Sequence, residues 1–308
     1  MKGNSGDRRA LSIALSQAAN ATVAQALEVP ENPVGACRRV GITGPPGVGK
    51  SSLIASLVAH RLGQAGDIAI AAIDPSSPVS GGALLGDRIR MENLADESRV
   101  FIRSFASRSS LDGLAANLPV ILQVFENGGF TELIVETVGV GQVDYAVRNL
   151  VDTMVLVLMP GMGDQIQTMK GGILEAADIY VINKADMPGA SQLASGLRMI
   201  VNRHTYHPED WTPVIIATSS GDESSIGDLS AAINAHQRWL TEKSGGSGAG
   251  LRRRGYHIGS LISRRVAELM HALPPETLGQ PLADLYRTVI KLLEAELNTD
   301  DACARSAP

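Results

Sequence analysis

The sequence has few cysteines, few aromatic residues and no strong excess of positive charge. Only Cys37 and Cys303 are cysteines among 308 residues, so we expect no disulfide framework and a reducing compartment. A net charge of -5 argues against a general binder of nucleic acid or membrane surfaces. No apolar run has the length of a membrane-spanning helix, and residues 1–21 lack the uninterrupted core of a signal peptide. We therefore expect a soluble, cytoplasmic protein with no nucleic-acid or membrane partner.

A glycine-rich loop is the first feature that carries chemistry. Residues 41–52, GITGPPGVGKSS, fit the pattern G-x-x-x-x-G-K-[ST] between an apolar strand pattern and an apolar-periodic helix. Glycines let backbone N–H groups approach a phosphate chain, and the helix N-terminus adds its dipole. The third glycine of a dinucleotide fingerprint is absent, so a nucleoside phosphate fits better. The expected contacts are Gly44, Pro45, Pro46, Gly47, Val48, Gly49, Lys50, Ser51 and Ser52.

The hydrophobic pattern predicts an α/β fold. From Gly41 onward, short apolar runs alternate with helical patterns, and most runs are apolar on both faces. Such runs are typical of a mostly parallel sheet flanked by helices, here that of a P-loop NTPase. The expected strands lie within residues 38–43, 67–74, 98–105, 131–138, 153–159, 178–186 and 212–220.

Three parts are expected along the chain. Residues 1–40 form a short helical segment, 41–243 the nucleotide-binding domain, and 244–308 a linker with a helical arm. KSGGSGAG, at residues 243–250, predicts a flexible linker by its composition. Two helices with apolar stripes follow it. A hairpin of this kind can pack on its own domain or on a second subunit, and the spacing alone does not decide between them.

The tetrapeptide NKAD identifies the base. It follows the apolar strand DIYVI, which places it at the carboxyl end of the sheet. Asp186 can accept from guanine N1–H and from the 2-amino group, whereas adenine would leave this carboxylate unpaired. Asn183 can hold loop backbone or the purine edge, and the Lys184 stem can cover the base. Where the next strand ends, backbone N–H groups of Thr218 and Ser219 could bind guanine O6. An exposed turn would explain an isolated NKAD equally well, but its place after a phosphate loop favours GTP and GDP.

Oxygen-bearing side chains predict a Mg²⁺ site next to the phosphates. The Ser51 hydroxyl should bind the ion, as phosphate-loop hydroxyls do. The apolar strand that starts at Leu133 ends in Glu136-x-x-Gly139, a variant of the usual D-x-x-G, and the Gly139 N–H would sense the γ-phosphate. Asp74 has the same strand-end position, and Asp87 lies in a glycine-rich loop that could close over the metal. Each carboxylate alone is equally well explained as a cap or turn residue, but together they form a coherent set.

The usual water-orienting glutamine is missing from this motif. In Ras-like proteins it follows the last glycine, where this chain has Val140. We therefore expect slow intrinsic hydrolysis that a partner or a rearrangement stimulates. Gln142 could take the role, although nothing in the sequence shows that it does.

Taken together, GPPGVGKSS, AAIDPSSPVSGGALLGDRIRM, ETVGVGQ, PGMGDQIQTMKGGILE and NKAD resemble the MeaB/ArgK/MMAA group of G3E P-loop GTPases. The likeness covers about residues 8–297. It implies a GTPase chaperone for an adenosylcobalamin-dependent acyl-CoA mutase, usually methylmalonyl-CoA mutase. Such a protein gates cofactor delivery and protects or reactivates the mutase. The resemblance also implies a homodimer joined through the C-terminal arm.

The same resemblance implies three switch segments. Asp87 falls in the first, residues 136–142 form the second, and residues 164–170 form the third. We expect the third to relay nucleotide state to the mutase, with Gln167 and Lys170 stabilising it when the partner docks. A cation brought in this way would oppose charge on the γ-phosphate in the transition state. The expected catalytic residues are Lys50, Asp87, Glu136 and Lys170.

Two other functions are compatible with a phosphate loop. A kinase or ATPase linked to transport of lysine, arginine or ornithine is the alternative, but NKAD selects guanine and nothing suggests a protein-phosphorylating centre. Nickel-loading GTPases commonly show a His-rich tract or a Cys-x-x-Cys handle. The six histidines here are scattered, and the closest pair, His204 and His207, is more typical of a surface turn.

Overall fold

The computed structural model describes residues 5–31, 37–64, 66–75, 97–107, 117–137, 146–162, 173–203, 209–219, 221–244 and 247–304, together with Met91, Leu94, Tyr206 and His207. The chain divides into two compact units, Met1–Arg254 and Gly255–Pro308, and each is considered by itself. Among the described helices, none combines the length and the apolar composition needed to cross a membrane.

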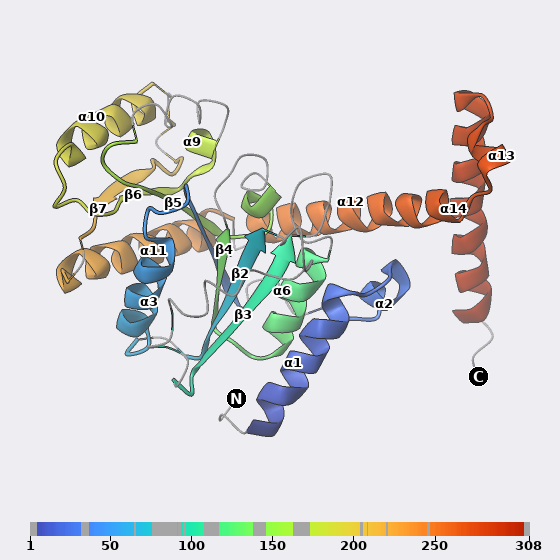
Figure 1. Cartoon of the computed structure of the whole chain (residues 1–308), viewed down its shortest axis with the longest axis horizontal. Helices are drawn as coiled ribbons and strands as arrows, with labels where there is room; N and C mark the ends of the chain where they lie inside the picture. The colour runs from blue at the N-terminus through green and yellow to red at the C-terminus, as the bar shows by residue number, and fades with distance from the viewer. Residues whose placement is uncertain are drawn as a thin grey trace. The chain divides into compact units, whose positions relative to one another are not determined.

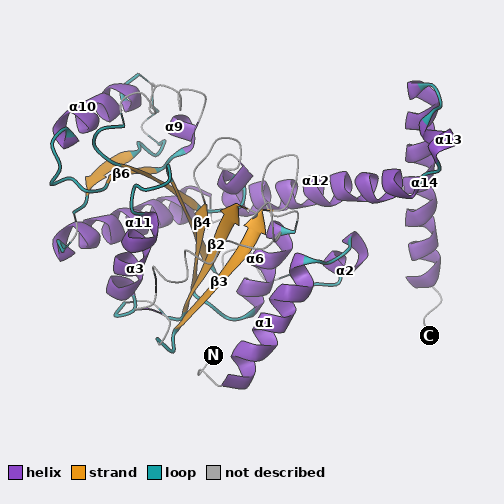
Figure 2. Ribbon diagram, viewed as in Figure 1, coloured by secondary structure: helices purple, strands orange, loops and turns teal. Residues whose placement is uncertain are grey.

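Within the described residues, seven strands form one parallel sheet at the centre of the first unit (Figures 1 and 2). The order across the sheet is β3-β2-β4-β1-β5-β6-β7, and each neighbouring pair is parallel. The strands are β1 (Arg38–Thr43), β2 (Ile68–Pro75), β3 (Val100–Ser107), β4 (Glu132–Thr137), β5 (Thr153–Leu158), β6 (Ile179–Ile182) and β7 (Val214–Ala217). The expected α/β fold is confirmed, although β6 and β7 are shorter than their apolar patterns suggested.

Helices cover both faces of the sheet. On one face, α3 (Lys50–Arg61) and α11 (Glu223–Ser244) bury their apolar stripes against β1, β4 and β5. On the other face, α9 (Ile173–Ala176) and α10 (Ala190–Val201) pack on β5 and β6. There, α6 (Leu118–Asn127) directs Phe125 edge-on against Phe101 and Phe105 of β3. Burial on both faces explains why the strands read as continuous apolar runs.

The N-terminal helices dock on the edge of the sheet that carries β3. They are α1 (Ser5–Ala19), which packs against α6, and α2 (Val23–Leu27). The guanidinium of Arg8 donates to the carbonyl oxygens of Glu97 and Ser98, at 3.2 and 3.0 Å. The side-chain amide of Asn117, which precedes α6, donates to the Ala21 carbonyl at 3.0 Å. The expected helical segment is therefore present, and both its side chains and its backbone attach it to the sheet domain.

The linker predicted at residues 243–250 is wrong for most of its length. Residues 243–244 end α11, and residues 247–250 form the first turn of α12 (Ser247–Ala272). Contacts within the first unit hold this part of α12: Ala249 is buried, Arg252 donates to the Val151 carbonyl at 3.0 Å, and Arg253 forms an ion pair with Asp152. These tertiary contacts outweigh the low helix propensity of glycine, which composition alone registers.

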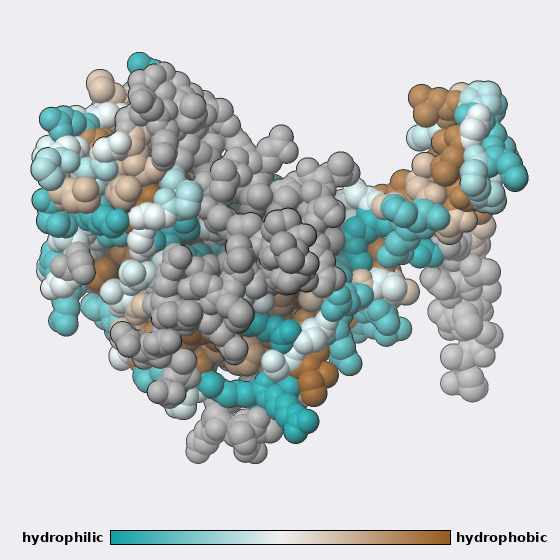
Figure 3. Space-filling view, in the orientation of Figure 1, coloured by the Kyte–Doolittle hydropathy of each residue, from teal (hydrophilic) through white to brown (hydrophobic). Residues whose placement is uncertain are grey.

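The second unit is helical and exposes apolar side chains. Beyond Arg254 it contains the rest of α12, α13 (Pro275–Leu278) and α14 (Leu282–Ala304). Ile258, Ile262, Leu282 and Tyr286 are each more than half exposed. Figure 3 shows hydrophobic residues gathered on the surface of this unit. Exposed apolar surface of this kind is typical of interaction sites.

Candidate nucleotide site

The phosphate loop joins β1 to α3 at the carboxyl end of the sheet. Gly44 has φ 146°, and a Cβ there would lie 2.1 Å from the carbonyl oxygen of Val157. Gly49 has φ 92°, and its Cβ would lie 2.6 Å from Nδ2 of Asn183. Both positions combine an unusual backbone with a close approach, so only glycine fits them. These are the two glycines that the sequence motif fixes.

Lys50 begins α3 and places its ammonium inside the loop. Its Nζ donates to the carbonyl oxygens of Gly44 and Pro45, at 2.7 and 3.0 Å, and the residue is 9% exposed. The N–H groups of the first helical turn have no acceptor within the helix. These donors, the helix dipole and the ammonium together give the loop a positive interior that suits an anion.

Ser51 and Glu136 meet where α3 begins and β4 approaches its end. The Ser51 hydroxyl donates to Oε1 of Glu136 at 2.9 Å, and both residues are buried. The pairing of β1 with β4 sets Ile42 beside Glu136, which brings the carboxylate to the phosphate loop. A hydroxyl and a carboxylate are the hard oxygen ligands that Mg²⁺ prefers, so this pair fits the expected ion.

The rest of the expected metal set is only partly placed. Pairing of β2 with β4 sets Ile73 beside Thr137, so the backbone of Asp74 reaches the same edge of the sheet. Its side chain, and all of Asp87, Gly139 and Lys170, lie outside the described part of the chain. Among the residues that are described, no three His, Cys, Asp or Glu side chains gather as a metal cluster.

Asn183 connects the NKAD loop to two other loops. Its Nδ2 donates to the Val48 carbonyl in the phosphate loop at 2.8 Å, and its Oδ1 accepts from the Thr218 hydroxyl at 3.0 Å. Its backbone N–H donates to the carbonyl of Leu158, the last residue of β5, at 2.8 Å. Of the two roles that the sequence left open, holding loop backbone is the one that these contacts support.

Thr218 corrects one expectation. Its backbone N–H donates to the Ile182 carbonyl at 2.8 Å and is therefore not free for guanine O6. The physical reason is that Thr218 continues the parallel ladder one residue beyond β7. Its hydroxyl and its carbonyl serve the NKAD loop instead, the carbonyl by accepting from the N–H of Ala185 at 2.9 Å. Ser219 remains as a candidate for the purine oxygen.

Lys184 turns the NKAD loop over the phosphate loop. It has φ 56°, an uncommon conformation for a residue other than glycine. Its Nζ donates to the Gly47 carbonyl at 3.1 Å, so its stem runs from one loop to the other. The turn leaves Asp186 exposed.

A cavity of about 620 Å³ lies beside these loops. Five residues that the sequence predicted as nucleotide contacts line it: Gly49, Ser52, Asn183, Lys184 and Ser219. Its volume suits a purine nucleoside. The loop that would hold phosphates and the loop that would hold the base therefore share one cavity.

A family model described as methylmalonyl Co-A mutase-associated GTPase MeaB matches residues 8–273. The chain belongs to the MeaB family. A putative GTPase of Pyrococcus abyssi is 43% identical over 208 residues, which are 67% of this chain and 64% of that relative. The mitochondrial methylmalonic aciduria type A homolog of Mus musculus is 36% identical over 198 residues, 62% of this chain and 47% of its own. The matched part thus spans less than two thirds of these curated relatives.

A crystal structure of an LAO/AO transport system kinase has the same fold. It covers 92% of this chain and 97% of its own, with a TM-score of 0.60 and 22% identity. At that identity the likeness shows the fold alone. The resemblance expected from the motifs is confirmed by the MeaB family match.

Some lining residues of this MeaB-family cavity were missed from the sequence. Ser56 and His60 line it from α3, and Asp222 and Glu223 line it where α11 begins. Ser56 and His60 follow Ser52 at intervals of four residues, so a helical projection from the phosphate loop would have found them. Asp222 accepts from the N–H groups of Ser224 and Ser225, at 3.1 and 3.3 Å, and caps α11. No motif marks it.

Proposed function

We propose that this MeaB-family protein binds GTP and GDP with Mg²⁺ and hydrolyses GTP to GDP and phosphate. One observation carries the proposal: the hydrogen bond from Asn183 to the Val48 carbonyl, 2.8 Å long. It holds the guanine-type loop against the phosphate loop, so that one bound molecule can contact both. The family match and the names of the relatives support the same function.

Each part of the site has a proposed role. The backbone of residues 44–52 binds the phosphates, and the Lys50 ammonium exchanges its carbonyl contacts for the β- and γ-phosphates. Asp186 accepts from guanine N1–H and the 2-amino group, which gives selectivity against adenine. Ser51 and Glu136 would hold Mg²⁺, with Asp74 and Asp87 as further candidates. Bound Mg²⁺ would neutralise part of the negative charge on the phosphates.

Hydrolysis in this proposal is slow until a partner acts. Val140 stands where a water-orienting glutamine is usual. The segment 164–170, which contains Lys170, is the candidate that relays nucleotide state to the partner. Lys170→Ala should therefore bind GTP normally and keep the basal rate, yet lose most of the partner-induced acceleration. Loss of nucleotide binding in this variant, or full stimulation, would remove the loop from the mechanism.

We propose an adenosylcobalamin-dependent acyl-CoA mutase, in the first place methylmalonyl-CoA mutase, as the partner, with cofactor loading and mutase protection as the role. The association of the MeaB family with methylmalonyl-CoA mutase supports this client. We further propose a cytoplasmic homodimer that forms through the arm, residues 244–308. The exposed Ile258, Ile262, Leu282 and Tyr286 support that interface. A transport-linked kinase or ATPase is the weaker candidate, because the guanine motif argues against it.

The test is GTP turnover by the full chain with and without purified cobalamin mutases. We expect methylmalonyl-CoA mutase to accelerate phosphate release. A rate that every candidate mutase leaves unchanged would contradict the chaperone role, while leaving the nucleotide site to be tested separately.

A further inference from the structure

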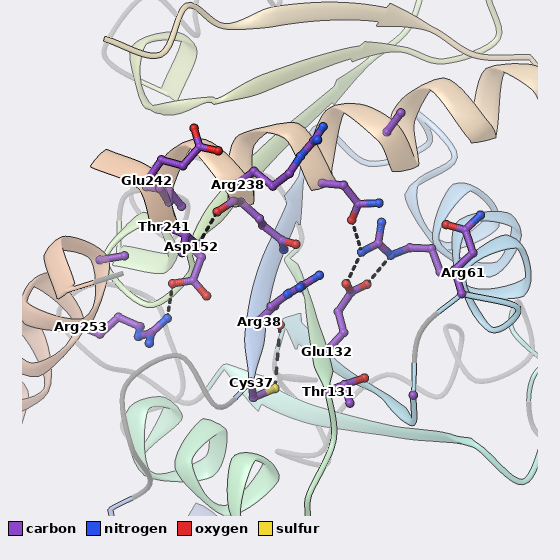
Figure 4. A pocket seen from close by; sticks show the side chains of 17 residues that line it. Cys37, Arg38, Arg61, Thr131, Glu132, Asp152, Arg238, Thr241, Glu242 and Arg253 are labelled. Carbon is purple, nitrogen blue, oxygen red and sulfur yellow. Dashed lines mark hydrogen bonds and ion pairs between the residues drawn. The ribbon is translucent and has the colours of Figure 1, made fainter. Parts of the chain in front are cut away.

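A buried arginine joins α3 to β4 at the end of the sheet where the strands begin, opposite to the nucleotide site. Arg61, the last residue of α3, faces Glu132, the first residue of β4, in the wall of a cavity of about 1110 Å³ (Figure 4). Its Nε donates to Oε1 of Glu132 at 2.8 Å, and its Nη2 donates to Oε2 at 2.5 Å. The two side chains are 4% and 3% exposed. The pair is therefore bidentate and almost fully shielded from water.

The other hydrogen bonds of Arg61 reach α11. Its Nη1 donates to the hydroxyl of Ser230 at 2.9 Å and to the carbonyl of the same residue at 3.3 Å. Its Nη2 also donates to Oδ1 of Asn234 at 3.1 Å. All three guanidinium nitrogens thus have acceptors, and these come from two different elements. Because the planar guanidinium must satisfy them together, the end of α3 is fixed against both β4 and α11.

Glu132 is itself held in place by the sheet. β4 lies between β1 and β2, where Glu132 pairs with Arg38 on one side and with Ile68 on the other. Between its two ends, α3 packs into the apolar core that contains Ile134 of β4. Apolar packing is not directional and tolerates small slides, whereas a buried bidentate pair specifies a register. Arg61 therefore determines how far along β4 the helix lies.

The same helix and strand meet again at the nucleotide site. They run in opposite directions, so the start of α3 lies beside the end of β4. Along α3, Ser51 lies about 15 Å from Arg61. Along β4, Glu136 lies about 13 Å from Glu132. Because these lengths nearly match, the register that Arg61 sets brings the Ser51 hydroxyl within 2.9 Å of Glu136.

We propose that Arg61 is a positioning residue for the Mg²⁺ site. Through its pair with Glu132, it holds α3 in the register that places the Ser51 hydroxyl beside the carboxylate of Glu136. The inference rests on the proposed function, because it requires Mg²⁺ to bind at these two oxygen-bearing side chains.

The metal should depend on this register more than the nucleotide does. Mg²⁺ demands nearly ideal octahedral geometry, and the groups of such a site must be held to within about 0.5 Å. Lys50 reaches the phosphates on a flexible stem, which tolerates a larger displacement of the helix. A small slide of α3 should therefore weaken Mg²⁺ binding and leave the nucleotide bound.

The test measures how Mg²⁺ slows the release of a fluorescently labelled GDP from the full chain. Glu132→Gln keeps the shape of the side chain, but its carboxamide has one acceptor oxygen and cannot accept both hydrogen bonds of Arg61. The Mg²⁺ concentration at the midpoint of the titration should rise about tenfold, the lower end of the effect usual for residues that orient metal ligands. The release rates without Mg²⁺ and at saturating Mg²⁺ should stay within about twofold of the wild type.

Glu126→Gln is the matched control. Glu126 of α6 accepts from Nε of Arg39 at 2.8 Å, and this pair is also buried, but it joins β1 to a helix on the other face of the sheet. Both variants should melt at a lower temperature than the wild type, because each leaves a buried arginine without its counter-charge. Only Glu132→Gln should raise the Mg²⁺ midpoint.

Arg61→Lys separates register from stability. The ammonium keeps the positive charge beside Glu132, but it lacks the planar fork that makes two parallel hydrogen bonds. This variant should melt closer to the wild type than Glu132→Gln does and should still show a raised Mg²⁺ midpoint. It also carries the test if Glu132→Gln does not fold.

Two kinds of result would overturn the proposal. Wild-type midpoints in both Glu132→Gln and Arg61→Lys, or an equal rise in Glu126→Gln, would reduce the pair to a structural contact and leave the proposed function standing. If Mg²⁺ does not slow GDP release from the wild type, the positioning role fails together with the proposed metal site.

Discussion

Removal of the Asn183 side chain tests whether the two nucleotide loops act as one site. Asn183→Ala deletes the hydrogen bonds to the Val48 carbonyl and from the Thr218 hydroxyl, which are 2.8 and 3.0 Å long. Each neutral hydrogen bond contributes about 1 kcal/mol net, so the pair contributes about 2 kcal/mol. Without these two hydrogen bonds, nucleotide binding must itself order the loops, and the free energy of ordering lowers the apparent affinity. The expected result is GDP binding weakened by about 30-fold.

The assay is a fluorescence titration with a labelled GDP, accompanied by a thermal melt. Thr218→Val is the matched variant, because it keeps the shape of Thr218 and removes only one of the two bonds; it should weaken binding by about fivefold. The double variant should bind no more weakly than Asn183→Ala, since both changes remove the same contact. A dissociation constant for Asn183→Ala within a factor of about two of the wild type would refute the reasoning.

Three further predictions follow from the same structure. Asp186→Asn should shift preference from guanine toward xanthine nucleotides, because a carboxamide can donate to the 2-oxo group; competition between GDP and XDP measures this. Lys50→Ala should abolish nucleotide binding while Ser51→Ala mainly weakens its Mg²⁺-dependent part, which titrations with and without a chelator separate; wild-type affinity in Lys50→Ala would exclude its role. Burial raises the pKa of Asp178 to about 6, above its unfolded value, so its contribution to stability is full below the unfolded pKa and is lost as pH rises through about 6. The unfolding free energy of the wild type should therefore rise relative to that of Asp178→Asn as pH falls from about 7 to about 5. Denaturant titrations measure it, and the same difference between the two proteins at both pH values would contradict the prediction.

The sheet and the phosphate loop can be predicted because local sequence determines them. A strand buried on both faces must be apolar throughout, and each of the seven runs identified from the sequence overlaps an observed strand, although β2 and β3 continue one and two residues beyond theirs. Gly44 and Gly49 are demanded by their own backbone angles and by close neighbours. The motif therefore fixes the loop before any tertiary contact is known.

The role of Thr218 could not be predicted, because it depends on the register between two strands. Ile182 pairs with Ala217, so Thr218 falls next to Asn183 and its N–H enters the ladder. Both strands are uniformly apolar, and a uniform pattern does not specify register. The first turn of α12 was missed for a related reason, since Arg252 and Arg253 hold it through residues about 100 positions earlier in the chain.

The central claim is that the chain is a guanine-specific nucleotide hydrolase. Parallel measurement of phosphate release from GTP and from ATP, by the unaltered full chain with Mg²⁺, tests it most directly. We predict slow but measurable release from GTP and a rate from ATP at least about 100-fold lower, because adenine leaves the Asp186 carboxylate unpaired. Equal rates with the two nucleotides, or release from ATP alone, would contradict the account.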